Sequence, residues 1–167
     1  MNKSDTILII EDEMIIAANI SLQLTNLGFK VDGIITKSED VMPHLLVHIP
    51  DIILMDINLK GKTDGIELAQ LIQKEYKIPI IYLTANSDEA HFERAKATNP
   101  YAFISKPFKK LDLQHAIELT LIRIHEEQLK DKNLVLTTEE PYILSDCIFV
   151  RSHDKMVKVC INNILYI

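Results

Sequence analysis

Short apolar segments rich in β-branched residues alternate with amphipathic segments five times over the first 130 residues of the chain. The apolar segments show no regular polar alternation, so we predict strands buried on both faces, at residues 6–10, 29–34, 51–56, 79–83 and 101–104. The segments between and after them carry apolar residues three to four positions apart, which predicts helices, at residues 13–27, 38–47, 65–76, 87–97 and 111–130.

A strand–helix repeat of this kind folds as a parallel sheet that is covered by helices on both faces. Right-handed crossovers then favour a doubly wound α/β fold. For five strands we predict the flavodoxin-like order 2-1-3-4-5. Ligands of such folds bind at the carboxyl ends of the strands, so the residues there are the first candidates for a functional site.

The composition is typical of a soluble globular protein, with 47% hydrophobic and 25% charged residues. No apolar run reaches the ~18 residues that a membrane-spanning helix needs, and the start MNKSDTILII has no cleavable signal segment. We therefore expect a cytoplasmic protein with no membrane partner, in which Cys147 and Cys160 stay reduced. The net charge of −6 argues against a nucleic-acid-binding surface on these residues as a whole.

The chain changes character after residue 130, where a polar segment leads to a proline. Two alternating segments, 147–152 and 155–161, then flank a polar turn, which predicts a β-hairpin that is marginally stable on its own. We interpret this tail as the truncated start of a second, β-rich domain; the alternative is an extension that packs on the first domain. The predicted boundaries are 1–125 for the first domain, 126–141 for a linker or helix extension, and 142–167 for the truncated strands.

Polar residues follow four of the predicted strands at their carboxyl ends. Glu11 and Asp12 follow the first strand, Asp56 ends the third, Thr84 follows the fourth and Lys106 lies just after the fifth. Because parallel strands end at the same edge of the sheet, we expect these side chains to converge there.

Three carboxylates that lie close together repel one another unless a cation offsets their charge. A hard, oxygen-binding ion such as Mg²⁺ suits such a cluster, and Lys106 adds a fixed positive charge. A hydroxyl and an ammonium are also good partners for phosphoryl oxygens. An aspartate beside a metal ion can attack phosphorus and form an aspartyl phosphate, so Asp56 is the candidate nucleophile.

Four short motifs carry a resemblance to a known family, in the expected order and spacing: IIED, LMDINL, LTA and SKPF, at residues 9–12, 54–59, 83–85 and 105–108. They resemble the motif set of receiver domains in two-component response regulators. The resemblance covers roughly residues 5–125. Any one motif is weak, but together with the strand–helix repeat they are specific.

The resemblance implies roles for individual residues. Asp56 looks like the phosphoacceptor and takes part in the metal site. Glu11 and Asp12 resemble the acidic pair that organises Mg²⁺, with Asp12 as the direct ligand. Asn58 stands where a backbone carbonyl completes the metal shell, and its side chain influences the lifetime of the phosphate.

The same resemblance implies a switch. Thr84 matches the hydroxyl that turns toward the phosphate, Lys106 the lysine that pairs with it, and Phe103 the switch aromatic. The Lys106–Pro107 bond is a candidate for the cis form. Two departures from the family pattern stand out: the loop at 60–65 has no proline and one extra residue, and a phenylalanine at the switch position has no hydroxyl to donate.

In this family a sensor histidine kinase phosphorylates the receiver, which changes the face formed by the fourth helix, fifth strand and fifth helix and often promotes homodimers. The tail DCIFVRSHDKMVKVCINNILYI resembles the first strands of a LytTR-type DNA-binding domain, which implies transcription regulation through a missing part of that domain. One alternative is a receiver that acts only through protein–protein contacts. Another is a metal-dependent phosphatase; such enzymes place a second carboxylate where Asn58 stands here, so we expect no enzyme.

Simpler interpretations exist for single residues. Glu11 and Asp12 could cap the following helix. Lys106 could be a surface lysine, Thr84 a helix cap and Phe103 an ordinary core aromatic. His44 and His48 have a spacing that could bind a metal, but we interpret them as an exposed helix face without partners.

Overall fold

The computed structural model describes residues 5–85, 89–135, 147–152 and 155–160. Contacts divide the chain into two units, Met1–Glu127 and Gln128–Ile167. The elements of the chain up to residue 135 are β1 (Thr6–Ile10), α1 (Met14–Asn26), β2 (Lys30–Ile35), the 3₁₀ turn η1 (Ser38–Asp40), α2 (Val41–Leu45), β3 (Ile52–Asp56), α3 (Gly65–Glu75), β4 (Ile80–Ala85), α4 (Glu89–Lys96), β5 (Ala102–Lys106) and α5 (Lys110–Val135).

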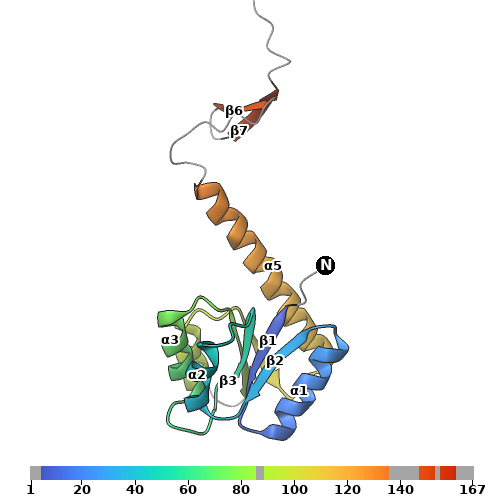
Figure 1. Ribbon diagram of the computed structural model, residues 1–167, viewed down its shortest axis with the longest axis vertical. Helices are drawn as coiled ribbons and strands as arrows, with labels where there is room; N and C mark the ends of the chain where they lie inside the picture. Colours follow the sequence, from blue (N-terminus) through green and yellow to red (C-terminus); the bar gives the residue numbers. More distant parts are fainter. Residues whose placement is uncertain (1–4, 86–88, 136–146, 153–154, 161–167) are drawn as a thin grey trace, which may run out of the picture. The chain divides into compact units, whose positions relative to one another are not determined.

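The sheet of the first unit has five strands in the order β2-β1-β3-β4-β5, and every pairing is parallel (Figure 1). This confirms the predicted doubly wound, flavodoxin-like fold. The central strands β1, β3 and β4 are almost wholly buried, as expected when helices cover both faces of a parallel sheet. The edge strands β2 and β5 are more exposed.

Two apolar cores lie on opposite faces of the sheet because successive strand residues point to opposite sides. On β1, Ile7 and Ile9 belong to the core that α1 and α5 cover, while Leu8 and Ile10 belong to the core beneath α2, α3 and α4. The same alternation continues on β3 and β4. Helices thus pack on both faces of the sheet, and this packing fixes the positions of the strand ends that carry the candidate residues.

Helix α1 ends where the sequence places a glycine. Gly28 has a φ of +88°, a left-handed conformation that glycine adopts without steric cost. Its N–H donates to the carbonyl of Thr25, and the N–H of Phe29 donates to that of Leu24. This paired bonding satisfies two carbonyls at the helix end and turns the chain into β2.

Two predicted helices differ from the structure in extent. The predicted helix at 38–47 is a 3₁₀ turn followed by the short α2, because Pro43 has no N–H to donate to the carbonyl four residues earlier. The last helix continues five residues beyond residue 130, to Val135. Residues 131–135 are polar in part but contain no glycine or proline, so nothing in them stops a helix.

The described part of the second unit, beyond the end of α5, is an antiparallel pair of strands, β6 (Cys147–Ser152) and β7 (Lys155–Cys160). The register pairs Cys147 with Cys160, in agreement with the predicted hairpin. Residues 126–135 of the predicted linker or helix extension belong to α5, whereas its residues 136–141, and residues 142–146 and 161–167 of the predicted second domain, lie outside the described residues. In the described segments, none of the helices has both the length and the apolar character needed to cross a membrane.

Candidate functional site

Three carboxylates meet at the carboxyl edge of the sheet. Glu11 and Asp12 directly follow β1, and Asp56 is the last residue of the adjacent strand β3. One carboxylate oxygen from each of the three lies within 4.8 Å of the others, and Glu11 and Asp56 are buried. The parallel pairing of β1 with β3 places both strand ends at this one edge.

Lys106, the last residue of β5, reaches across the edge to two of these carboxylates. Its Nζ lies 2.6 Å from Glu11 Oε2 and 2.9 Å from Asp56 Oδ2, and its side chain is only 17% exposed. Burial raises the pKa of Glu11, and the charge of Asp56 adds to the rise. Burial opposes the charged form of Lys106, but its hydrogen bonds to both carboxylates hold the pKa of Lys106 above its ordinary value. Lys106 is therefore not a surface lysine.

Both oxygens of Asp56 are held in place. Oδ2 accepts from Lys106, and Oδ1 accepts from the backbone N–H of Asn58 at 3.0 Å. Glu11 is held in a similar way, because its Oε1 accepts from the N–H of Glu13 at 3.2 Å. Glu13, not Glu11 or Asp12, is the N-cap residue of α1, and no side chain caps that helix. The helix-capping interpretation of the acidic pair is therefore wrong.

Asp12 has a different partner, which the sequence analysis missed. Lys60 Nζ, in the loop between β3 and α3, lies 3.4 Å from Asp12 Oδ2. The Asp12 side chain is 12% exposed and that of Lys60 is 82% exposed. The two residues are 48 positions apart in the sequence. The only sequence signal for this ion pair is that Lys60 belongs to the loop with the extra residue.

The loop after Asp56 ends at Asp64 and Gly65, which bond to α4 and to the residue after β3. The N–H of Gly65 donates to the carbonyl of Ile57 at 3.0 Å. Asp64 caps α3 by accepting from the N–H groups of Ile66 and Glu67, and the Glu67 side chain accepts from the N–H of Asp64, which completes a reciprocal capping box. Arg94 of α4 adds an ion pair to Asp64 at 3.1 Å. Neither the hydrogen bond of Gly65 nor the ion pair of Arg94 was predicted.

Thr84 and Phe103 lie on β4 and β5, outside the cluster of carboxylates. The Thr84 hydroxyl is nearly buried and donates to the carbonyl of Ala85 at 3.1 Å. The Phe103 ring packs against Phe92 of α4 and Tyr82 of β4, with centroids 4.6 and 5.7 Å away. It is partly buried and joins the core beneath α4. The Lys106–Pro107 bond, a candidate for the cis form, is cis.

His44 of α2 and His48, three residues beyond the end of that helix, have partners, contrary to the prediction. His44 Nε2 lies 2.7 Å from Asp32 Oδ2, and the rings of His44 and His48 stack with centroids 5.3 Å apart. Asp32 lies on β2, so the pair joins α2 to the edge of the sheet.

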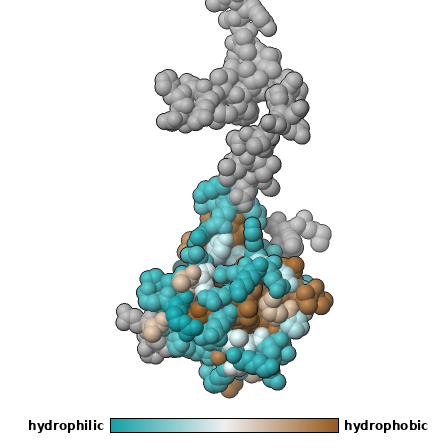
Figure 2. Space-filling model, turned by 90° about the vertical axis from the view of Figure 1, so that its left-hand side faces the viewer, coloured by the Kyte–Doolittle hydropathy of each residue, from teal (hydrophilic) through white to brown (hydrophobic). Residues whose placement is uncertain are grey.

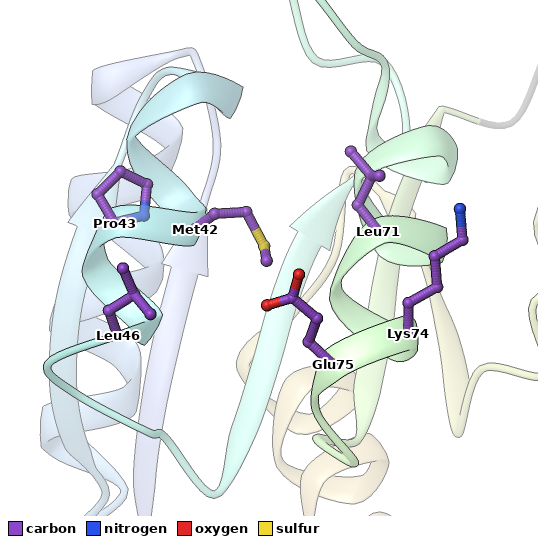
Figure 3. A pocket seen from close by; sticks show the side chains of 6 residues that line it. All are labelled: Met42, Pro43, Leu46, Leu71, Lys74 and Glu75. Carbon is purple, nitrogen blue, oxygen red and sulfur yellow. The ribbon is translucent and has the colours of Figure 1, made fainter.

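A hollow of about 410 Å³ lies between α2 and α3, away from the carboxylates. Figure 3 shows the four apolar and two charged residues that line it: Met42, Pro43, Leu46, Leu71, Lys74 and Glu75. Figure 2 shows apolar surface on the side of the molecule that faces left in Figure 1, where α2 and α3 lie. None of the lining residues belongs to the carboxylate cluster, so the hollow is a separate feature.

Residues 7–118 match the response regulator receiver domain family. The chain belongs to this family. The receiver is 33% identical over 120 residues to the transcriptional regulatory protein PdtaR of Mycobacterium tuberculosis, a match that covers 72% of this chain and 58% of that protein.

Solved receivers share the fold. The receiver domain of a modulated diguanylate cyclase from Desulfovibrio desulfuricans is 34% identical, with a TM-score of 0.70 over 77% of this chain and 99% of that one. The N-terminal domain of a response regulator/sensory box/GGDEF protein from Carboxydothermus hydrogenoformans is 30% identical, with a TM-score of 0.67 over 74% and 98%.

Proposed function

We propose that a sensor histidine kinase phosphorylates this receiver on Asp56 in a Mg²⁺-dependent reaction. The observation that carries the proposal is the arrangement around Asp56. Its buried carboxylate lies between the Lys106 ammonium and the Asn58 amide, with ligand oxygens of Glu11 and Asp12 within 4.8 Å. Membership of the receiver family makes a histidine kinase the partner.

The donor set suits Mg²⁺. Three carboxylates held close together, two of them buried, form an oxygen-only set with more negative charge than Lys106 and Lys60 offset. We assign Glu11, Asp12 and Asp56, with the backbone carbonyl of Asn58, as the residues that hold the ion. When bound, the ion offsets carboxylate charge and stabilises the negative charge on the phosphoryl oxygens.

The chain's own residues prepare Asp56 for attack. The backbone N–H of Asn58 and the ammonium of Lys106 orient the Asp56 carboxylate. One of its oxygens then forms a bond to phosphorus while the bond from phosphorus to the donor imidazole nitrogen breaks. The leaving nitrogen keeps the electron pair of the broken bond, and the imidazole leaves neutral because its other ring nitrogen carries a proton. Lys106 then pairs with the new phosphoryl oxygens. Attack of water on phosphorus later releases inorganic phosphate and restores the Asp56 carboxylate.

Phosphorylation adds negative charge at the edge of the sheet, and we propose that Thr84 and Phe103 convey it to the surface. The Thr84 hydroxyl leaves the Ala85 carbonyl for a phosphoryl oxygen. Phe103 and its neighbour Phe92 repack with α4, which changes the face formed by α4, β5 and α5. In this proposal the altered face forms a homodimer.

The proposed output is transcription regulation through a LytTR-type DNA-binding domain that begins in the second unit. Two features support it: the antiparallel pair of β6 and β7, and the likeness to a transcriptional regulatory protein. The match spans 58% of that relative's length. In this proposal DNA contact is made by the missing part of the LytTR-type domain. Output through protein contacts alone is the alternative, and DNA binding by a chain extended beyond residue 167 distinguishes the two.

We further propose that the protein is cytoplasmic, where sensor kinases deliver phosphate, and that it turns over no small substrate. Asn58 stands where phosphatases with an aspartate nucleophile place a second carboxylate, and an amide cannot take up or release a proton at neutral pH.

Labelling with acetyl phosphate tests the central proposal. The wild-type chain should take up phosphate only with Mg²⁺, and Asp56→Asn should take up none, because the amide is not a nucleophile. Asp112→Asn, which alters an exposed aspartate of α5, is the control and should label like the wild type. Label that persists in a folded Asp56→Asn variant would show that another residue is the acceptor.

A further inference from the structure

The two lysines at the carboxylate cluster differ in how firmly they are held. Lys106 is largely buried and bonds to two carboxylates, whereas Lys60 is 82% exposed and, among the residues that the structure describes, pairs with one carboxylate, that of Asp12, at 3.4 Å. Exposed ion pairs contribute little, because the charges keep most of their hydration and the side chain loses conformational freedom. Lys60 can therefore leave Asp12 easily, whereas Lys106 is held by two buried carboxylates.

The loop holds the backbone of Lys60 in place although its side chain is free to move. Leu59 on one side is buried. Gly61 on the other side packs so closely that a Cβ there would lie 2.9 Å from Ser38 Oγ of η1. The fixed path of the loop thus keeps the Lys60 ammonium within reach of Asp12.

From these contacts we propose that the Lys60 ammonium competes with the divalent cation for the Asp12 carboxylate. Without the cation this ammonium offsets the charge of Asp12, the most exposed of the three carboxylates. A cation that takes Asp12 as a ligand must break this ion pair and then lies near a displaced positive charge. Lys60 therefore lowers the affinity of the site for Mg²⁺. This inference rests on the proposed function.

The test is the Kd of Mg²⁺ for the full chain, measured by calorimetry at low ionic strength. Lys60→Met should bind Mg²⁺ about 2–5-fold more tightly than the wild type, the range expected from the loss of one exposed ion pair. The difference should shrink in high salt, because salt screens exposed charges. Lys60→Arg, which keeps the charge and the reach, should restore the wild-type affinity.

Lys62 provides a matched control from the same loop. It is exposed like Lys60, but its charge acts on Glu39. Lys62→Met should leave the Kd of Mg²⁺ close to the wild-type value. If it tightens binding as much as Lys60→Met, the effect is one of overall charge and the inference is wrong.

The outcomes separate this inference from the function on which it rests. Mg²⁺ that binds equally well, or less well, to Lys60→Met than to the wild type overturns the inference alone. Failure of both proteins to bind Mg²⁺ overturns the proposed metal site and the inference with it. Because Lys60 is exposed, its replacement should leave the thermal unfolding of the metal-free chain almost unchanged, which verifies that the variants are folded.

Discussion

Gly65 should be the glycine that tolerates substitution least. It is the first residue of α3, and its N–H donates to the carbonyl of Ile57, the residue after β3. A Cβ built on Gly65 would lie 2.0 Å from the backbone carbonyl oxygen of Asp56, whereas real contacts of this kind are not shorter than 3.0 Å. In Gly65→Ala the helix and the strand must therefore move apart by about 1 Å, and backbone cannot rotate away as a flexible side chain can.

The opposing effects can be compared. Alanine favours helices over glycine by at most about 1 kcal/mol, and by less in the first turn. Against this stand about 1–3 kcal/mol for forcing a group into a packed region and about 1 kcal/mol for weakening the Gly65 hydrogen bond. The net effect is a loss of about 1–3 kcal/mol in unfolding free energy, or about 3–10 °C in Tm. Because Asp56 carries the contacted carbonyl, phosphorylation by acetyl phosphate should also slow.

Two other glycines separate the possible causes, and chemical denaturation compares all three variants. Gly28→Ala meets no atom within 4 Å but has a φ of +88°, so it should lose about 1 kcal/mol from backbone strain alone. Gly33→Ala meets His44 Cε1 at an ordinary 3.4 Å and should change stability by less than about 0.5 kcal/mol. If Gly65→Ala is as stable as Gly33→Ala, the reasoning from the close contact is refuted.

Three further measurements test other parts of the structure. Mg²⁺ at about 100 times its Kd should raise the unfolding free energy by about 2.7 kcal/mol; a calorimetric scan that shows the same gain in Asp12→Asn would contradict the assigned ligand. Tyr82→Phe removes a hydroxyl that lies 2.9 Å from Thr98 Oγ1 in the core, and should cost about 1 kcal/mol in denaturation experiments; no loss would mean that this bond contributes nothing. Burial and the hydrogen bond to Glu127 raise the pKa of Tyr101 from 10 to about 12, so its contribution to stability is complete below pH 10 and is lost as the pH rises toward 12. Tyrosinate absorbance should show a late step that Tyr101→Phe reduces, and an unchanged curve would contradict the raised pKa.

The sheet could be predicted from the sequence because its signal is local and repeated. Each central strand, such as Ile52–Asp56, is an unbroken apolar run, and a parallel sheet with both faces covered requires such runs. The polar residue at each strand end then shares one edge by topology alone, which is why Glu11, Asp12, Asp56 and Lys106 could be grouped without coordinates. These predictions needed only strand order and direction.

Features that depend on the path of a loop could not be predicted in this way. The pair of Lys60 with Asp12 and the pair of Arg94 with Asp64 join residues whose separation in sequence carries no periodic signal. Pro43 was visible in the sequence, but the division of the second predicted helix into a 3₁₀ turn and the short α2 was not predicted from it. The roles of Thr84 and Phe103 stay predictions, since they concern a phosphorylated state.

The unequal anchoring of the two lysines determines where metal binding should perturb the receiver. Displacing Lys106 would leave Glu11 and Asp56 as buried, unpaired charges, a change that costs several kcal/mol when a buried pair loses one partner. Displacing Lys60 from Asp12 costs at most about 1 kcal/mol, because the released ammonium is already solvated. Displacement of Lys60 has the lower free-energy cost, so we expect Mg²⁺ to displace Lys60. Mg²⁺ should therefore shift the backbone resonances of residues 57–64 while those of β5 change little. Large shifts confined to β5 would mean that Lys106, not Lys60, yields to the ion.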